Sequence, residues 1–145
     1  MPTPISFNKA DSSATLTNRV ALKTFIEKRV KKEGLSINSL SYIFCTDKYL
    51  LKINKDFLSH DYYTDIISFD LSEEPGYLIG EVYISVDRVK ENAKTHGATF
   101  KEEMLRVVFH GALHFCGYKD KKPSDAKKMR QMEDTWLNAY LSSDK

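Results

Sequence analysis

Two histidines one helical turn apart are the residues of this chain that point most directly to chemistry. His110 and His114 stand near the end of an apolar, helix-like stretch, and Asp120 follows shortly after Gly117. Residues four apart lie on the same face of a helix, so both imidazoles can face one metal ion. Gly117 is suited to a left-handed turn that ends the helix and brings Asp120 towards the histidines. Two histidines and one carboxylate leave a coordination position open, as in catalytic zinc sites.

The histidine pair also has a purely structural interpretation. Either ring can be a core histidine whose nitrogens bond to backbone carbonyls, and the pair alone fits both interpretations about equally. The carboxylate beyond a helix-ending glycine favours a metal. A metalloprotease of the familiar zinc type is disfavoured, because its motif needs a glutamate directly after the first histidine, where this chain has Gly111.

The composition is that of an ordinary globular chain. Its 145 residues are 41% hydrophobic and 29% charged, which predicts one compact domain covering 1–145. The net charge of +2 is a mild basic bias that does not by itself indicate nucleic acid. No apolar run approaches the ~20 residues that cross a bilayer, and residues 1–10 lack a signal pattern. We therefore expect a cytoplasmic protein with no membrane partner.

The two cysteines do not extend the candidate site. Cys45 and Cys116 are too few and too scattered for a disulfide framework or a thiolate zinc cluster. Cys116 follows His114 by two residues, which on a helix turns it away from the metal-facing side. Both cysteines are expected to be small buried hydrophobic residues.

Hydrophobic periodicity and turn residues predict the order of strands and helices. Strands are expected at 5–8, 40–45, 65–71 and 78–85, the last two as a hairpin or near neighbours around a turn at 73–76. Helices are expected at 15–33, from Thr46 to about Phe57, at 86–96, from Thr99 to Phe115, and after Pro123 with Ser124 as cap. This order predicts an α+β fold, with a small mixed four-stranded sheet covered by about five helices.

The helix that carries the histidines is expected to be central. Thr99 and Glu102 form a capping box at its start, and apolar residues occupy nearly all its sides as far as Phe115. Such a helix is buried on most faces. The metal site is therefore expected at the end of a central helix, at the edge of the core.

Three motifs occur in order along the chain: Thr-Asp-Ile-Ile-Ser-Phe at 64–69, Gly-Glu-Val-Tyr-Ile-Ser at 80–85, and His-Gly-Ala-Leu-His-Phe-Cys-Gly-Tyr at 110–118. Together they resemble the signature of the YbeY family, metal-dependent bacterial endoribonucleases that mature ribosomal RNA. Asn54 and the segment 129–133 fit the same pattern. The resemblance runs from about residue 40 to about residue 137.

This resemblance implies a fold, a cofactor and a substrate. It implies a four-stranded sheet with surrounding helices and one zinc ion in a cleft. The implied activity is single-strand-specific cleavage in 16S ribosomal RNA 3′-end maturation, together with ribosome quality control. The implied partners are the ribosomal RNA precursor and the small ribosomal subunit, with no DNA. The oligomeric state is left open.

Two sites in the sequence depart from the family pattern. The family usually has a third histidine where this chain has Asp120, and that histidine is preceded by an aspartate where this chain has Lys119. At the second site, the family usually has an arginine thought to serve catalysis, where this chain has Leu58. A carboxylate in place of a neutral imidazole lowers the net charge of a zinc site from about +2 to about +1. We therefore expect weaker acidification of bound water and weaker attraction of RNA phosphate. Leu58 lacks the charge that would hold a phosphate.

Basic residues after the metal motif are candidates for an RNA path. The group consists of Lys119, Lys121, Lys122, Lys127, Lys128 and Arg130. A solvated loop and helix face is the usual setting of such residues, but their position beside the expected ligands favours RNA slightly.

A loop expected at 58–63 holds further candidates. His60 precedes the Thr64 motif and is the candidate general acid or base, with an exposed bystander as the alternative. Tyr62, Tyr63 and Tyr118 can stack on unpaired bases, although a core or rim role fits them equally.

Two functions of different classes follow. The first is a metal-dependent endoribonuclease acting on single-stranded ribosomal RNA, which the open coordination position favours. The alternative is a ribosome-assembly factor whose metal is mainly structural, which Asp120 and Leu58 favour.

Overall fold

A four-stranded mixed sheet lies at the centre of the computed structural model, which describes residues 4–12, 16 and 18–143. Its strands, in the spatial order β1-β2-β4-β3, are β1 (Ile5–Lys9), β2 (Ser36–Cys45), β4 (Tyr77–Ser85) and β3 (Ile66–Asp70). β2 runs parallel to both β1 and β4, and β3 pairs antiparallel with β4. β3 is therefore an edge strand, and the expected hairpin of the last two strands is confirmed.

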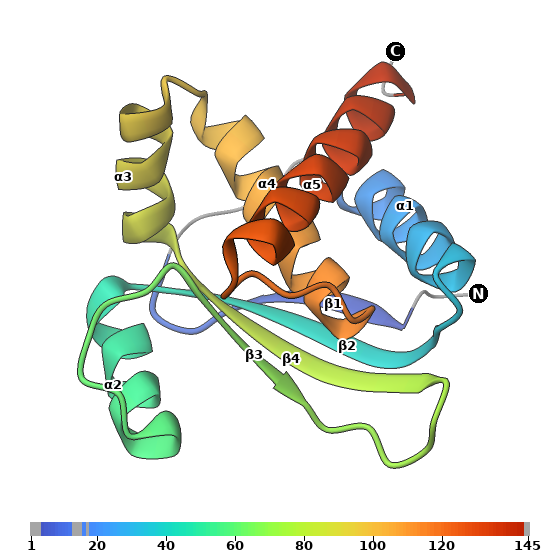
Figure 1. Ribbon diagram of the computed structural model, residues 1–145. Helices are drawn as coiled ribbons and strands as arrows, with labels where there is room; N and C mark the ends of the chain where they lie inside the picture. The colour runs from blue at the N-terminus through green and yellow to red at the C-terminus, as the bar shows by residue number, and fades with distance from the viewer. Residues whose placement is uncertain (1–3, 13–15, 17, 144–145) are drawn as a thin grey trace.

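Five helices in the described part of the chain cover this sheet unequally. They are α1 (Arg19–Lys32), α2 (Asp47–Leu58), α3 (Val86–His96), α4 (Phe100–Phe115) and α5 (Pro123–Ser143). Figure 1 shows α1, α4 and α5 stacked on one face, with α2 alone on the other. The main core fills the first face, and a small cluster of Cys45, Leu50 and Ile67 fills the second. The expected α+β class and mixed sheet are confirmed.

Some boundaries differ from the predicted ones. β2 begins at Ser36 rather than 40, because residues with weak strand character pair there with the start of β4. α1 begins at Arg19, and the predicted start at Thr15 lies outside the described residues. α5 begins at Pro123, and Ala126 donates to the carbonyl of Lys122, so the predicted cap at Ser124 is wrong. Proline suits the first helical position because it has no N–H to leave unpaired.

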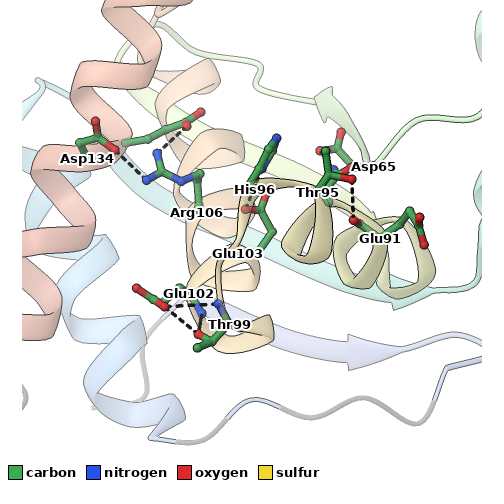
Figure 2. Close-up of polar contacts among 11 residues, drawn as sticks. Asp65, Glu91, Thr95, His96, Thr99, Glu102, Glu103, Arg106 and Asp134 are labelled. Carbon is green, nitrogen blue, oxygen red and sulfur yellow. Dashed lines mark hydrogen bonds and ion pairs between the residues drawn. The ribbon is translucent and has the colours of Figure 1, made fainter.

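The buried helix α4 is fixed to the sheet at two points. The buried Tyr42 hydroxyl donates to the Val108 carbonyl at 3.0 Å. A Cβ at Gly111 would lie 3.1 Å from Val82 Cγ1 and 3.2 Å from Ile66 Cδ1, so glycine permits a close approach of the helix to the sheet between the two histidines. The predicted capping box at Thr99 is present at the other end, as Figure 2 shows. In the described part of the chain, no helix is both long and apolar enough to cross a bilayer.

Candidate metal centre

His110, His114 and Asp120 come together at the C-terminal end of α4. His110 Nε2 lies 3.1 Å from Asp120 Oδ2, and His114 Nε2 lies 3.6 Å from Asp120 Oδ1. One ligand atom from each residue falls within 4.8 Å of the others. Two imidazole nitrogens and a carboxylate oxygen at this separation form a donor set that suits zinc and leaves a fourth position open. The structure thus brings together the three residues that the sequence singled out.

The turn after α4 returns the chain to the histidines. Gly117 has φ +102°, its N–H donates to the backbone carbonyl of His114, and the N–H of Tyr118 donates to the backbone carbonyl of Leu113. This pair of bonds is a Schellman motif, in which a left-handed residue ends the helix and satisfies its last carbonyls. The expected turn at Gly117 is confirmed, and Asp120 lies three residues beyond it.

A carboxylate behind the site holds the first histidine. The His110 Nδ1–H donates to Glu133 Oε2, with 2.6 Å between the heavy atoms, and this bond directs Nε2 towards Asp120. Arg106 binds the other oxygen of Glu133 at 3.2 Å and Asp134 at 2.7 Å, the second contact being visible in Figure 2. A carboxylate behind a metal-binding imidazole fixes its tautomer and ring orientation.

The two imidazoles have opposite pKa shifts. Burial lowers the pKa of His110, but the hydrogen bond and charge of Glu133, helped by Asp120 and Asp65, raise it above its usual value overall. The pKa of His114 is lowered, first by burial, against the attraction of Asp120. Without a metal, His110 is therefore the more easily protonated of the two imidazoles.

The metal centre borders a groove between α4 and the edge strand β3. Its volume is about 510 Å³, and its lining consists of Thr64, Asp65, Ile66, Ser68, Asp70, His110, His114, Phe115 and Asp120. Asp65 also borders a smaller polar cavity behind His110, where Asn92 donates to it at 3.3 Å. Burial raises the pKa of Asp65, although the charge of His110 opposes this shift.

Other predicted site residues lie outside this groove. His60 is exposed, and its Nδ1 lies 3.0 Å from the Tyr62 hydroxyl. Leu58 is the last residue of α2, the helix that Figure 1 shows on the other face of the sheet. Neither is among the described residues that line the groove. The geometry therefore gives no support to His60 as general acid or base, and that role stays a prediction.

The basic residues fall into two groups. Lys119, Lys121 and Lys122 are exposed in the turn around Asp120, and the charge of Lys121 contributes to lowering the pKa of His114. Arg130 lies on α5 and borders the polar cavity behind His110. The three lysines thus lie beside the metal centre, and their contact with RNA stays a prediction.

Glu133, Ser68 and Asp70 border the site or the groove but were not predicted as site residues, although the first two lie in segments that resemble the family. Glu133 had a usable signal, because it falls four residues after Met129 and three before Trp136 on the buried face of α5. A carboxylate on such a face needs a buried partner. For Ser68 the signal was its place in the 64–69 motif. Asp70 had no such signal, since strand periodicity alone does not tell which edge of a sheet borders a groove.

Comparison with known proteins places these features in a family context. The family model described as "Endoribonuclease YbeY" matches residues 5–141. Proteins named endoribonuclease YbeY are similar to this chain. The protein of Cytophaga hutchinsonii is 49% identical over 92% of this chain and 94% of its own length. The protein of Christiangramia forsetii is 44% identical over 86% of this chain and 87% of its own length. The solution structure of TM1509 from Thermotoga maritima superposes with a TM-score of 0.65 at 28% identity, covering 96% of this chain and 90% of the other.

Proposed function

The chain belongs to the endoribonuclease YbeY family, and we propose on this premise that it is a zinc-dependent hydrolase that cuts single-stranded RNA. Its proposed substrate is the 16S ribosomal RNA precursor, cut during 3′-end maturation and ribosome quality control on the small subunit in the cytoplasm. The observation that carries this proposal is the meeting of His110, His114 and Asp120 at an open groove.

The donor set fits a catalytic ion better than a buried structural one. Three protein ligands of this kind leave one position for water or substrate, and the side chains of His114 and Asp120 are 38% and 37% exposed. A zinc ion held there would polarise a phosphate oxygen and lower the pKa of a water molecule. The assembly-factor alternative is not favoured, because the relatives are named for nuclease activity.

The surrounding residues orient this chemistry. Glu133 keeps the Nδ1 proton of His110, so Nε2 is left to bind the ion. The left-handed turn at Gly117 returns the chain towards α4, where Asp120 Oδ2 lies 3.1 Å from His110 Nε2. Lys121, beside His114, supplies positive charge near the phosphate that approaches the ion.

A cleavage assay on ribosomal RNA precursor tests the proposal. Zinc-loaded protein is expected to cut the precursor, chelated protein to stop, and added zinc to restore the activity. His114→Ala should lose both metal and cleavage, whereas Glu91→Gln, on the exposed surface of α3, should keep both. Equal cleavage by the zinc-loaded and chelated proteins would contradict the proposed metal dependence. Metal analysis of the purified protein identifies the ion.

A further inference from the structure

The edge strand β3 has backbone groups along its outer edge that β4 does not pair. β4 makes ladder bonds with Asp65 and Leu71 at the two ends of β3. Because the bonding direction alternates along an antiparallel strand, the backbone groups of Ile66, Ser68 and Asp70 point away from β4. The carbonyl of Ile66 accepts a hydrogen bond from the Thr64 hydroxyl at 3.4 Å. These three β3 residues line the groove opposite α4. A ligand that lies along the groove therefore meets both main-chain donors and acceptors and the side chains of Ser68 and Asp70.

The charge of the groove lining along β3 determines which part of a bound RNA strand can lie against β3. The groove lining contains Asp65, Asp70 and Asp120, and the described residues that line it include no lysine or arginine. A phosphodiester backbone running along β3 would meet carboxylates without a compensating cation. The phosphates of a bound RNA are instead expected to be attracted to an ion at the metal centre and to the lysines outside the groove. The bases of the RNA are therefore the part that faces β3.

Asp70 lies at the C-terminal end of β3, on the side of the groove that β3 forms. It pairs in register with Gly80, and a Cβ at Gly80 would lie 2.8 Å from the ring of Phe115, so Phe115 covers the sheet beside Asp70. The Ser72 N–H donates to Asp70 Oδ1 at 3.0 Å, which orients the exposed carboxylate. Ser68 lies one pleat repeat away, about 7 Å along the same face.

An oriented carboxylate selects among bases by the number of donors they present. Its two oxygens accept two parallel N–H groups. Guanine offers adjacent N1–H and N2–H donors on its pairing edge, whereas the other bases offer one N–H position there. Single-stranded RNA leaves this edge unpaired and accessible.

We propose that the Asp70 end of the groove is a guanine-binding subsite, in which the Asp70 carboxylate accepts the N1–H and N2–H groups of a guanine at a fixed distance from the cleaved bond. This inference rests on the proposed ribonuclease function, and it assigns to that function a base preference set by β3. The preference follows from Asp70 itself and is independent of which ion the centre holds.

The test uses short single-stranded RNAs that contain one guanosine among adenosines and uridines. Zinc-loaded wild type is expected to cut at a constant offset from the guanosine. Inosine, which lacks the N2 amino group, should lower kcat/KM at that bond about tenfold. Asp70→Asn should cut guanosine and inosine RNAs equally well. Asp56→Asn, an exposed carboxylate of α2, is the matched control and should keep the wild-type ratio.

Binding separates this inference from the proposed function. Fluorescence anisotropy with metal-free protein should show tighter binding of the guanosine RNA than of the inosine RNA for wild type and equal binding for Asp70→Asn. If wild type cuts no RNA, the proposed function fails, and the affinity ratio still decides on the subsite. The guanine-binding subsite would be ruled out if wild type bound and cut the guanosine and inosine RNAs equally. It would also be ruled out if Asp70→Asn kept the wild-type preference for the guanosine RNA.

Discussion

Glu133 Oε2 lies 2.6 Å from His110 Nδ1, so a buried carboxylate of α5 orients a candidate metal ligand on α4. Arg106, on the turn of α4 that precedes His110, binds the other carboxylate oxygen and thereby restricts rotation of the Glu133 side chain. The geometry of the candidate metal centre thus depends on the packing of two helices. Its metal affinity is expected to depend on Glu133, which is not itself one of the three candidate ligands.

Glu133→Ala should weaken zinc binding about 10- to 100-fold, because His110 loses the acceptor that fixes its tautomer. Glu133→Gln keeps the shape of the side chain but weakens the hydrogen bond, so an intermediate affinity is expected. Competition with a chromophoric chelator measures these affinities. Glu91→Gln serves as the control, and unchanged affinity in Glu133→Ala would show that the His110 contact is irrelevant to the metal.

Asp120 is expected to set both metal retention and the pH dependence of cleavage. Asp120→Ala should weaken zinc binding, because one of the three ligands is lost. Asp120→His should keep the ion, raise the net charge of the site and move the acid limb of the pH–rate profile to lower pH. Metal analysis and pH–rate profiles of the three proteins check this. Identical behaviour in all of them would remove Asp120 from the ligand set.

His110 should make metal binding and metal-free stability respond oppositely to pH. A proton and the ion compete for its imidazole, so zinc affinity should fall as the pH drops through its raised pKa. In the metal-free protein, a folded pKa above the unfolded value adds stability that is fully present below about pH 6.5 and is lost as the pH rises through the folded pKa.

Urea unfolding of the chelated protein at several pH values measures the stability effect, and His110→Gln should lose it. The lowered pKa of His114 acts with the opposite sign, so the comparison must be between wild type and this single variant. A pH dependence that His110→Gln leaves unaltered would assign the effect to other groups.

Gly117 should couple helix termination to metal binding. Its φ of +102° is unfavourable for any residue with a Cβ, so Gly117→Ala should lower the free energy of unfolding by roughly 1 kcal/mol and displace Asp120. Gly34→Ala, at φ +97° after α1, is the matched control and should lower stability similarly without weakening zinc binding. Equal zinc affinity in the two variants would mean that the turn does not position Asp120.

The lysines around Asp120 should govern the salt dependence of RNA binding. If Lys119, Lys121 and Lys122 contact phosphates, their replacement by alanine should flatten the log–log slope of affinity against salt by about 0.7 per lost contact. Replacing Lys90, Lys94 and Lys101, all exposed and outside the groove lining, should leave the slope unchanged. A triple alanine variant with the wild-type slope would remove this turn from the RNA path.

The sequence determined the local parts of this protein. The spacing of His110 and His114, the capping box at Thr99 and the left-handed turn at Gly117 each depend on a few neighbouring residues, and each is present where it was predicted. The α+β class followed in the same way, because hydrophobic periodicity reports which face of each element is buried.

Only the tertiary structure decided which distant residues complete the site. Glu133 is 23 residues from His110 in sequence and Asp70 is 40 residues away. They border the same histidine-bearing helix because α5 packs on α4 and β3 takes the sheet edge beside it. Residue type made His60 a candidate general acid or base, but in the structure it lies outside the groove lining and 3.0 Å from the Tyr62 hydroxyl. Residue type and periodicity carry no information about such long-range contacts, since these depend on how whole elements pack.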